Sequence, residues 1–261
     1  MDYKKFILGL AKEAGTVIKK NFTRGMKKEW KDGVSVVTET DRIINQMVID
    51  SVKKTFPGHS ILAEENSDLS GDNEFIWVCD PVDGTKPFAH AIPTCVFSLA
   101  LTRRGQSIAG AVYDPFMERM FFAEKNKGAS LNEEKIKVSS QNTIKNSLFG
   151  VCYGWRDEPF DFSALGQALK TESGEIIDVG SITYMGVLVA AGELAGTMFQ
   201  GTKPYDTAAL KVIVEEAGGK VTDLFGNDQR YDRDIRGHLI SNGLLHDRLL
   251  EMLRTTVREI E

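Results

Sequence analysis

The chain has 261 residues, 42% of them hydrophobic and 26% charged, which is the composition of an ordinary globular protein with one large or two smaller domains. A formal net charge of −5 without any long Lys/Arg cluster argues against a nucleic-acid partner, and no run approaches the roughly 18 apolar residues that span a bilayer, so no membrane partner is expected. The opening residues lack the apolar core of a signal peptide, and we expect a cytoplasmic protein.

The first part of the sequence predicts two amphipathic helices with a short strand between them. Apolar residues recur with helical period over residues 2–22, and residues 31–38 are predicted to form a turn followed by a strand. Thr40 is expected to cap the second helix, which ends before residues 57–58, a Pro-Gly pair. Asp41 falls in the first turn of that helix and is most simply a capping acid, with a ligand role as the alternative.

A series of short strands follows, and acids stand where two of them end. Residues 60–63 are predicted to form a strand that delivers Glu64 and Glu65, although adjacent acids on a loop are usually solvated charges. After an exposed loop at residues 66–73, a buried strand is expected at residues 75–79. Further strands are predicted at residues 95–102, 108–113 and 119–123. This meander implies an antiparallel sheet packed against the two opening helices.

A polar stretch at residues 139–147 divides the chain into predicted halves of residues 1–145 and 146–261, which together would form one compact catalytic unit. In the second half strands and helices alternate, which is typical of an α/β arrangement with parallel strands. The strands are expected at residues 148–152, 175–179, 197–199 and 238–241, and the helices at residues 160–169, from Ser181, at residues 205–217 and up to Ile260.

The stretch Asp80-Pro81-Val82-Asp83-Gly84-Thr85 directly follows the buried strand. Taken alone, this stretch predicts a β-turn, because Pro, Asp and Gly favour the dihedral angles of turns. At the carboxyl end of a strand, however, two carboxylates with the carbonyl of Val82 between them present only hard oxygens, which suit Mg²⁺ or Mn²⁺ better than zinc. Gly84 allows a phosphate close to the backbone, and the Thr85 hydroxyl can hold a water molecule.

The sequence does not indicate a zinc-hydrolase site or a reactive cysteine pair. The four histidines show no helical pair with the spacing of a zinc hydrolase. The three cysteines, Cys79, Cys95 and Cys152, are widely spaced and are expected to be reduced core residues. In the second half Asp206 lies in the first turn of its predicted helix, after Pro204, as either a dipole-matching acid or a ligand.

Four pieces of the sequence stand in one order: Asp41, Ala63-Glu64-Glu65, Asp80-Pro81-Val82-Asp83-Gly84-Thr85 and Tyr205-Asp206-Thr207-Ala208-Ala209. Together they resemble the inositol monophosphatase family of lithium-sensitive, magnesium-dependent phosphatases, over nearly the full length of the chain. The resemblance implies an α/β layered sandwich in which helix and sheet layers alternate, as in inositol monophosphatase and fructose-1,6-bisphosphatase. It also implies a homodimer.

The same resemblance implies the roles of individual residues. Carboxylate and carbonyl oxygens would hold two Mg²⁺ ions, the first at Glu64, Asp80 and Val82, and the second at Asp80, Asp83 and Asp206. A third, looser ion would lie near Glu65 or Glu64. Thr85 would orient the attacking water with Asp41 behind it, and Glu64 counts with them among the catalytic residues. Contacts to the phosphate or to the rest of the substrate would come from Gly84, Thr85, Ser181, Phe199 and Lys203.

General chemistry explains why a phosphatase needs such groups. A phosphate monoester and its leaving oxygen are negative, so the site must offset charge and hold attacker and leaving group in line, which two neighbouring cations do. Backbone amides at Gly84 and Thr85 can bind phosphate oxygens if a helix begins there. The resulting prediction is a Mg²⁺-dependent phosphomonoesterase that acts on a small phosphorylated metabolite.

The sequence departs from the inositol-specific pattern at several points. Tyr205 stands where the family often has tryptophan, and Lys86-Pro87 and Lys203-Pro204 look more like the histidinol-phosphatase branch. In inositol-handling members a glutamate seven residues before the last metal aspartate binds ring hydroxyls, and the same count here reaches Phe199, or Gln200 with a shift of one residue. A phenylalanine accepts no hydrogen bonds, so inositol 1-phosphate is expected to be hydrolysed without strong preference.

Alternatives to inositol monophosphate as substrate are histidinol phosphate, a 3′(2′),5′-bisphosphate and fructose bisphosphate. A protein of another class, a non-catalytic regulatory module with the same fold, is the second hypothesis. The acids favour the enzyme, because convergent carboxylates repel each other without a metal and a binding module does not need them.

Overall fold

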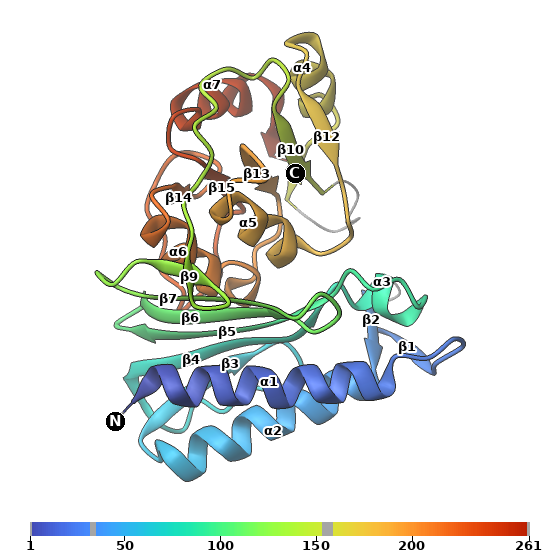
Figure 1. Ribbon diagram of the computed structural model, residues 1–261, viewed down its shortest axis with the longest axis vertical. Helices are drawn as coiled ribbons and strands as arrows, with labels where there is room; N and C mark the ends of the chain where they lie inside the picture. Colours follow the sequence, from blue (N-terminus) through green and yellow to red (C-terminus); the bar gives the residue numbers. More distant parts are fainter. Residues whose placement is uncertain (1, 32–34, 153–158, 260–261) are drawn as a thin grey trace.

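Helix and sheet layers alternate through the molecule (Figure 1). The computed structural model describes residues 2–31, 35–152 and 159–259. Helices α1 (Tyr3–Asn21) and α2 (Glu39–Thr55) form the first layer and pack on one face of a sheet. Helices α5 (Ile182–Ala190) and α6 (Ala208–Glu216) lie between that sheet and a second one, whose outer face is covered by α4 (Leu165–Thr171) and α7 (His246–Thr256). The predicted layered α/β sandwich is confirmed.

The first sheet has seven strands in the order β3-β4-β5-β6-β7-β8-β9. Their bounds are β3 His59–Ala63, β4 Asp72–Asp83, β5 Val96–Arg103, β6 Gln106–Asp114, β7 Arg119–Glu124, β8 Ala129–Leu131 and β9 Glu134–Lys135. The antiparallel meander from β4 onward agrees with the prediction, whereas β3 pairs parallel to β4. Because β3 and β4 run in the same direction, their carboxyl ends, where the acids stand, meet at one edge of the sheet.

The second sheet has the order β12-β10-β13-β15-β14, with parallel pairing of β10 to both β12 and β13 and antiparallel pairing elsewhere. Its strands are β10 Leu148–Val151, β12 Glu175–Ile177, β13 Gly196–Phe199, β14 Lys220–Thr222 and β15 His238–Ser241. The parallel component was expected, but β14 was not. The two sheets lie within residues 59–135 and 148–241, and the proposed boundary at residue 145 stays a prediction.

Several predicted helix ends are wrong. Thr38 and not Thr40 precedes the first turn of α2, and its backbone N–H donates to Asp41. Residues 160–161 form strand β11 (Phe160–Asp161), paired with β16 (Arg258–Glu259), so α4 starts later and α7 ends at Thr256. Pairing with a strand almost a hundred residues away overrides the local pattern at both places. The expected end at Ile260 lies outside the described residues.

The helix expected over residues 205–217 is in fact two elements. A 3₁₀ turn, η1 (Pro204–Asp206), precedes α6, so Asp206 is held by that turn and not by the first turn of an α-helix. Pro204 at the first position lacks an N–H and favours such a tight start.

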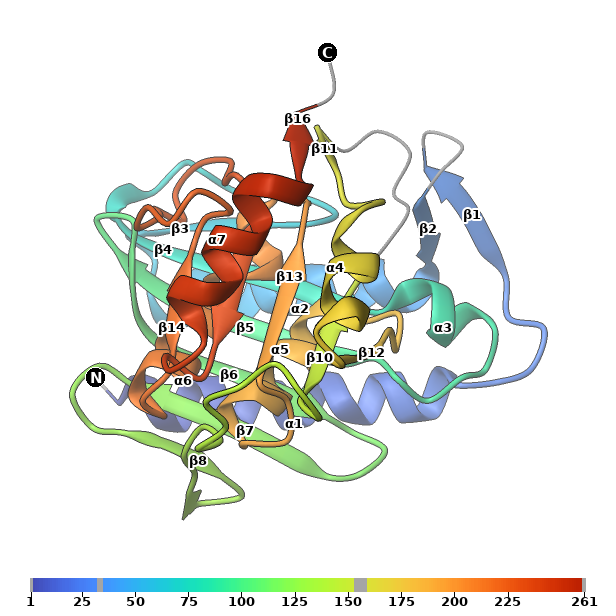
Figure 2. The ribbon, with the colours of Figure 1, turned by 90° about the horizontal axis from the view of Figure 1, so that it is seen from above.

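Strands β1 (Lys28–Lys31) and β2 (Ser35–Thr38) form an antiparallel hairpin, and the turn expected between them lies mostly outside the described residues. The hairpin and α3 (Thr85–Ala89) lie at the same side of the molecule in both views (Figures 1 and 2). Cys79, Cys95 and Cys152 are free thiols in the interior, as expected. None of the helices in the described residues is both long and apolar enough to cross a membrane.

Candidate active site

The carboxyl end of β4 presents the acids of the central motif, because Asp80 and Asp83 are among its last residues. The pairing of β4 with β5 shifts register between Asp80 and Asp83, and one Asp80 carboxylate oxygen accepts from the Val82 amide at 3.0 Å. Gly84 follows with φ of +92°, a left-handed conformation that glycine adopts at low cost, and α3 begins at Thr85. The strand expected to end at residue 79 thus continues through Asp83, and of the motif only Gly84 forms the turn.

Three carboxylates meet beside this turn. Asp80, Asp83 and Asp206 each offer an oxygen, and these oxygens lie within 4.8 Å of one another. Asp206 comes from η1 in the second sheet's half of the chain, so the group joins the two parts of the molecule. Asp83 also accepts from the Ser181 hydroxyl at 2.5 Å and the Thr183 amide at 2.6 Å, both at the start of α5. These contacts hold Asp83 against the second half.

A second acidic group lies at the end of β3. Oxygens of Asp41, Glu64 and Glu65 lie within 4.8 Å of one another. The Lys31 ammonium contacts both glutamates, with 3.4 Å to the Glu64 carboxylate. The resemblance groups Glu64 with Asp80 and the carbonyl of Val82. In the structure Glu64 shares a group with Asp41 and Glu65, and its charge also acts on Asp80. Lys31 escaped the sequence analysis because it lies at the end of a polar hairpin strand.

The Thr85 hydroxyl lies between the two acidic groups. Its oxygen is 3.2 Å from a carboxylate oxygen of Asp41 and 2.9 Å from the carbonyl of Val82, and both are hydrogen-bond acceptors. The other Asp41 oxygen accepts from the amide and hydroxyl of Thr38. Asp41 is therefore a capping acid, as the sequence most simply suggests, and a partner of Thr85 at once.

The remaining predicted substrate residues lie in different surroundings. Ser181 is buried against Asp83 and caps α5 by accepting from the Tyr184 amide at 3.2 Å. Lys203 is exposed and pairs with Asp234 at 3.2 Å. Phe199 is only 4% exposed, and its ring packs 5.6 Å from that of His238, so in this structure it offers little surface to a substrate. Gln200 is equally buried, and the one-residue shift would not change this.

Burial and mutual repulsion shift the acids away from their ordinary behaviour. Burial, followed by the neighbouring Glu64 charge, raises the pKa of Asp80 well above its usual value. Burial raises the pKa of Glu64 to about 7 although Lys31 opposes this, and it raises the pKa of Asp41 to about 6. Burial also raises the pKa of Asp83, against the hydrogen bonds from Ser181 and Thr183. Such carboxylates are stable as anions only beside positive charge.

The comparisons with known proteins identify the chain. The model of the inositol monophosphatase family matches residues 2–259. The chain belongs to this family. A Thermotoga maritima protein named fructose-1,6-bisphosphatase/inositol-1-monophosphatase is 32% identical over 262 residues, covering 100% of this chain and 99% of the relative.

A solved structure and a second curated relative are also similar over nearly the whole chain. The solved structure of an inositol monophosphatase (IMPase) from Thermotoga maritima has a TM-score of 0.88 at 29% identity and covers 98% of both chains. A Pseudomonas aeruginosa protein named Nus factor SuhB is 29% identical, over 96% of this chain and 94% of the relative. The chain is a phosphoric monoester hydrolase of this family, a phosphatase of small phosphorylated metabolites.

The donor sets fit the metal dependence of the family. Both acidic groups offer only carboxylate oxygens, the hard donors that Mg²⁺ and Mn²⁺ prefer, and soft sulfur ligands are absent from both. Burial, together with neighbouring carboxylate charges, raises the pKa values of Asp80 and Glu64, and a bound cation would favour their charged forms. The residues present therefore suit hard divalent cations.

These pKa shifts predict how the stability of the metal-free protein depends on pH. Because the pKa values of Asp41 and Glu64 are higher in the folded protein than in the unfolded chain, the folded state binds more protons between about pH 4 and pH 7. Stability is then lost as the pH rises through this window. Burial lowers the pKa values of His238 to about 3 and of His246 to about 4, which opposes this trend, so the diagnostic quantity is the gain from Mg²⁺. We expect the melting temperature in Mg²⁺ minus that in EDTA to be larger at pH 8 than at pH 5, because the acids then bind the cation without first losing a proton. An equal or smaller gain at pH 8 would contradict this.

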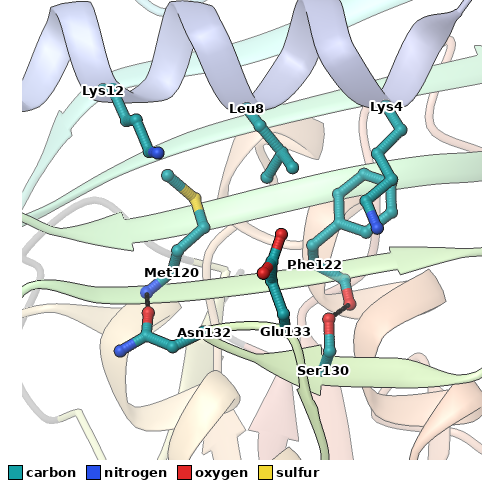
Figure 3. Close-up of a pocket in the computed structure, with 8 residues that line it drawn as sticks. All are labelled: Lys4, Leu8, Lys12, Met120, Phe122, Ser130, Asn132 and Glu133. Carbon is teal, nitrogen blue, oxygen red and sulfur yellow. Dashed lines mark hydrogen bonds between the residues drawn. The ribbon is translucent and has the colours of Figure 1, made fainter.

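A cavity of about 270 Å³ lies away from the acids, between α1 and the strands β7 and β8 (Figure 3). Lys4, Leu8 and Lys12 of α1 face Met120 and Phe122 of β7 across it. Because none of the clustered carboxylates lines it, we place the active site at the acids and not at this cavity.

Proposed function

We propose that this phosphatase is Mg²⁺-dependent and holds two or three ions. The first would be held by Glu64, Asp80 and the carbonyl of Val82, the second by Asp80, Asp83 and Asp206, and a third, looser ion by Glu65 or Glu64. Mn²⁺ is the expected substitute. The observation that supports this most is the convergence of three buried or half-buried carboxylates from both halves of the chain. Acids at such separation repel each other unless a cation lies between them.

When bound, the cations supply positive charge that activates a water and stabilises the leaving oxygen of the ester. The chain's own residues orient the reactants. The Thr85 O–H donates to Asp41 or to the carbonyl of Val82, which leaves a lone pair of its oxygen to accept from the attacking water. The first turn of a helix leaves backbone N–H groups without helical partners, and at Gly84 and Thr85 these can bind phosphate oxygens.

The role of Thr85 predicts a selective loss of turnover. Thr85→Ala removes the hydroxyl that orients the water but no proposed metal ligand, so kcat is expected to fall about 100-fold or more while the Mg²⁺ concentration for half-saturation changes little. Thr85→Ser keeps the hydroxyl and is expected to retain most of the activity. If Thr85→Ala instead alters Mg²⁺ saturation and leaves kcat intact, the hydroxyl has a structural role only.

The substrate is proposed to be a small phosphate monoester of the inositol monophosphate type, without strong preference for inositol. Neither Phe199 nor Gln200 carries the carboxylate that would accept hydrogen bonds from ring hydroxyls, and each unsatisfied hydroxyl costs roughly 1–3 kcal/mol. The name of the Thermotoga relative makes fructose 1,6-bisphosphate an equally necessary test compound.

A panel of phosphates compared by kcat/KM tests this preference. It contains inositol 1-phosphate, histidinol phosphate, fructose 1,6-bisphosphate and a 3′(2′),5′-bisphosphate. We expect inositol 1-phosphate to be cleaved, with at least one less hydroxylated or cationic ester at a similar kcat/KM. A value for inositol 1-phosphate far above all others would show the interpretation to be wrong.

A second candidate function is a regulatory one, in which the protein acts by binding a partner and not by catalysis. The name of the relative Nus factor SuhB supports it. Mg²⁺-dependent hydrolysis of a generic aryl phosphate by the purified protein separates the two, because a contact role needs no turnover. Lithium inhibition, a homodimer, a cytoplasmic location and the absence of a nucleic-acid partner stay predictions. Activity in LiCl tests lithium inhibition, and sedimentation tests the homodimer. Cell fractionation tests the location, and a filter-binding assay tests for nucleic-acid binding.

A further inference from the structure

Asp206 is held differently from the other acids of its group. Asp80 and Asp83 lie at the end of a paired strand, whereas Asp206 closes the short turn η1, whose capping bond runs from the Thr207 amide to the carbonyl of Pro204 at 3.2 Å. A single 3₁₀ turn has poorer hydrogen-bond geometry than an α-helix. The residues packed around the turn must therefore fix the direction of the Asp206 carboxylate.

Thr183 contacts this turn from α5. Its side chain is fully buried, and its hydroxyl donates to the backbone carbonyl of Asp206 at 3.3 Å. The amide of the same residue donates to the Asp83 carboxylate at 2.6 Å. The Thr183 hydroxyl also hydrogen-bonds the Asp83 carboxylate, so Thr183→Val bears on both acids, whereas Thr207→Val bears on the turn of Asp206 alone.

Thr207 and His238 hold the other side of the turn. Thr207 follows Asp206 directly, and its hydroxyl oxygen lies 2.8 Å from Nδ1 of His238, with both residues fully buried. His238 belongs to β15, which is paired on both sides in the second sheet. Its Nε2 has no hydrogen-bond partner among the described residues. A proton on Nδ1 therefore suits the site best, because it leaves Nε2 as a bare acceptor and not as a buried N–H without a partner.

A fully buried polar pair carries a desolvation cost that an apolar pair in the same place would not. Thr207 is the next residue after Asp206, a member of the acidic group. A hydrogen bond between Thr207 and His238 can therefore fix the backbone that carries the Asp206 carboxylate. We propose that Thr183, Thr207 and His238 are positioning residues that hold Asp206 in the orientation in which its carboxylate joins those of Asp80 and Asp83. This inference rests on the cation site of the proposed function.

The test is calorimetric titration of the metal-free protein with Mg²⁺, without substrate. Thr183→Val and Thr207→Val keep the shape of the side chain and remove the hydroxyl, and each is expected to weaken Mg²⁺ binding about 10-fold or more, as for other partners that orient metal ligands. Thr183→Ser and Thr207→Ser restore the hydroxyl and are expected to bind as the wild type does. His238→Asn, whose amide can replace Nδ1, is expected to bind better than His238→Leu.

A matched control exists in the same half of the chain. Thr222 forms a second buried Thr–His pair, with 3.1 Å from its hydroxyl oxygen to Nε2 of His246, and the hydrogen bonds that the described residues show for this pair do not involve the two acidic groups. Thr222→Val is expected to lower the melting temperature and leave Mg²⁺ affinity unchanged. If Thr183→Val and Thr207→Val behave in the same way, the residues are structural and the inference is overturned.

Asp206→Asn separates failure of this inference from failure of the proposed function. Undiminished Mg²⁺ binding by Asp206→Asn would remove Asp206 from the cation site and the proposed assignment with it. Weakened binding by Asp206→Asn together with normal binding by the two valine variants would overturn the positioning role alone. If the inference holds, adding Thr207→Val to Asp206→Asn brings no further loss, because the two changes act on one ligand.

Discussion

Asp83→Asn is expected to abolish both turnover and the stabilisation of the protein by Mg²⁺. The substitution removes the charge of an acid that lies within 4.8 Å of Asp80 and Asp206 and leaves an oxygen able to accept from Ser181 and Thr183. A ligand present at 100 times its dissociation constant stabilises the folded state by about 2.7 kcal/mol, and this gain would be lost. The expected fall in kcat is about 100-fold or more, since charge stabilisation at the reacting group is removed.

The measurement is the melting temperature with and without Mg²⁺ at pH 8, beside the rate of hydrolysis of an aryl phosphate. In EDTA the variant is expected to be at least as stable as the wild type, because one of the mutually repelling charges is gone. Asp223→Asn is the control, since Asp223 is also buried and accepts amide hydrogen bonds but lies outside both acidic groups. Full activity of Asp83→Asn at ordinary Mg²⁺ would refute the site assignment.

Gly84→Ala is expected to disturb the turn that carries Asp83 and Thr85. With φ at +92°, a side chain at this position is strained by roughly 1–3 kcal/mol. A methyl group would in addition lie 2.8 Å from the carbonyl oxygen of Thr94 and 3.0 Å from Cβ of Ser181. The turn must move to relieve these contacts, and a displacement of about 1 Å at a reacting group can cost about 100-fold in rate.

Gly25→Ala is the matched control for this prediction. Gly25 also has a positive φ, +71°, but an added methyl group would meet nothing within 4 Å. It should therefore lose some stability and keep its kcat. Thermal unfolding and steady-state kinetics of both variants test this prediction. Equal kcat values for Gly84→Ala and Gly25→Ala would show that the contacts of an added methyl group at Gly84 do not affect catalysis.

Much of the local structure could be read from the sequence because it depends on neighbours along the chain. The apolar period of α1 and the apolar run in β4 are local patterns, and both elements formed, although β4 begins three residues earlier and ends four residues later than expected. Of the central motif, Gly84 takes the turn conformation that its dihedral preference indicates, whereas Asp80 and Asp83 belong to the strand. Errors arose where a distant strand decides, as at Phe160, which pairs with Glu259.

The site required more than the order of motifs. The sequence placed acids at the ends of β3 and β4, and the parallel pairing of those strands brings them to one edge. It did not show that Thr183 would reach Asp83 across 100 residues of chain, or that Lys31 would contact Glu64 and Glu65. Contacts of this kind depend on how the layers pack, and no periodicity along the chain encodes them.

The sequence by itself determined which chemical groups are present: hard oxygen donors, a hydroxyl at Thr85, and no acid at position 199. The tertiary structure decided which of them meet. It closes Asp206 onto Asp80 and Asp83, joins Glu64 to Asp41 and Glu65, and turns Phe199 into the core against His238. The reason is physical, because the distances between side chains are set by layers that pack to bury apolar surface, and the core around α5 and α6 contains residues of both halves.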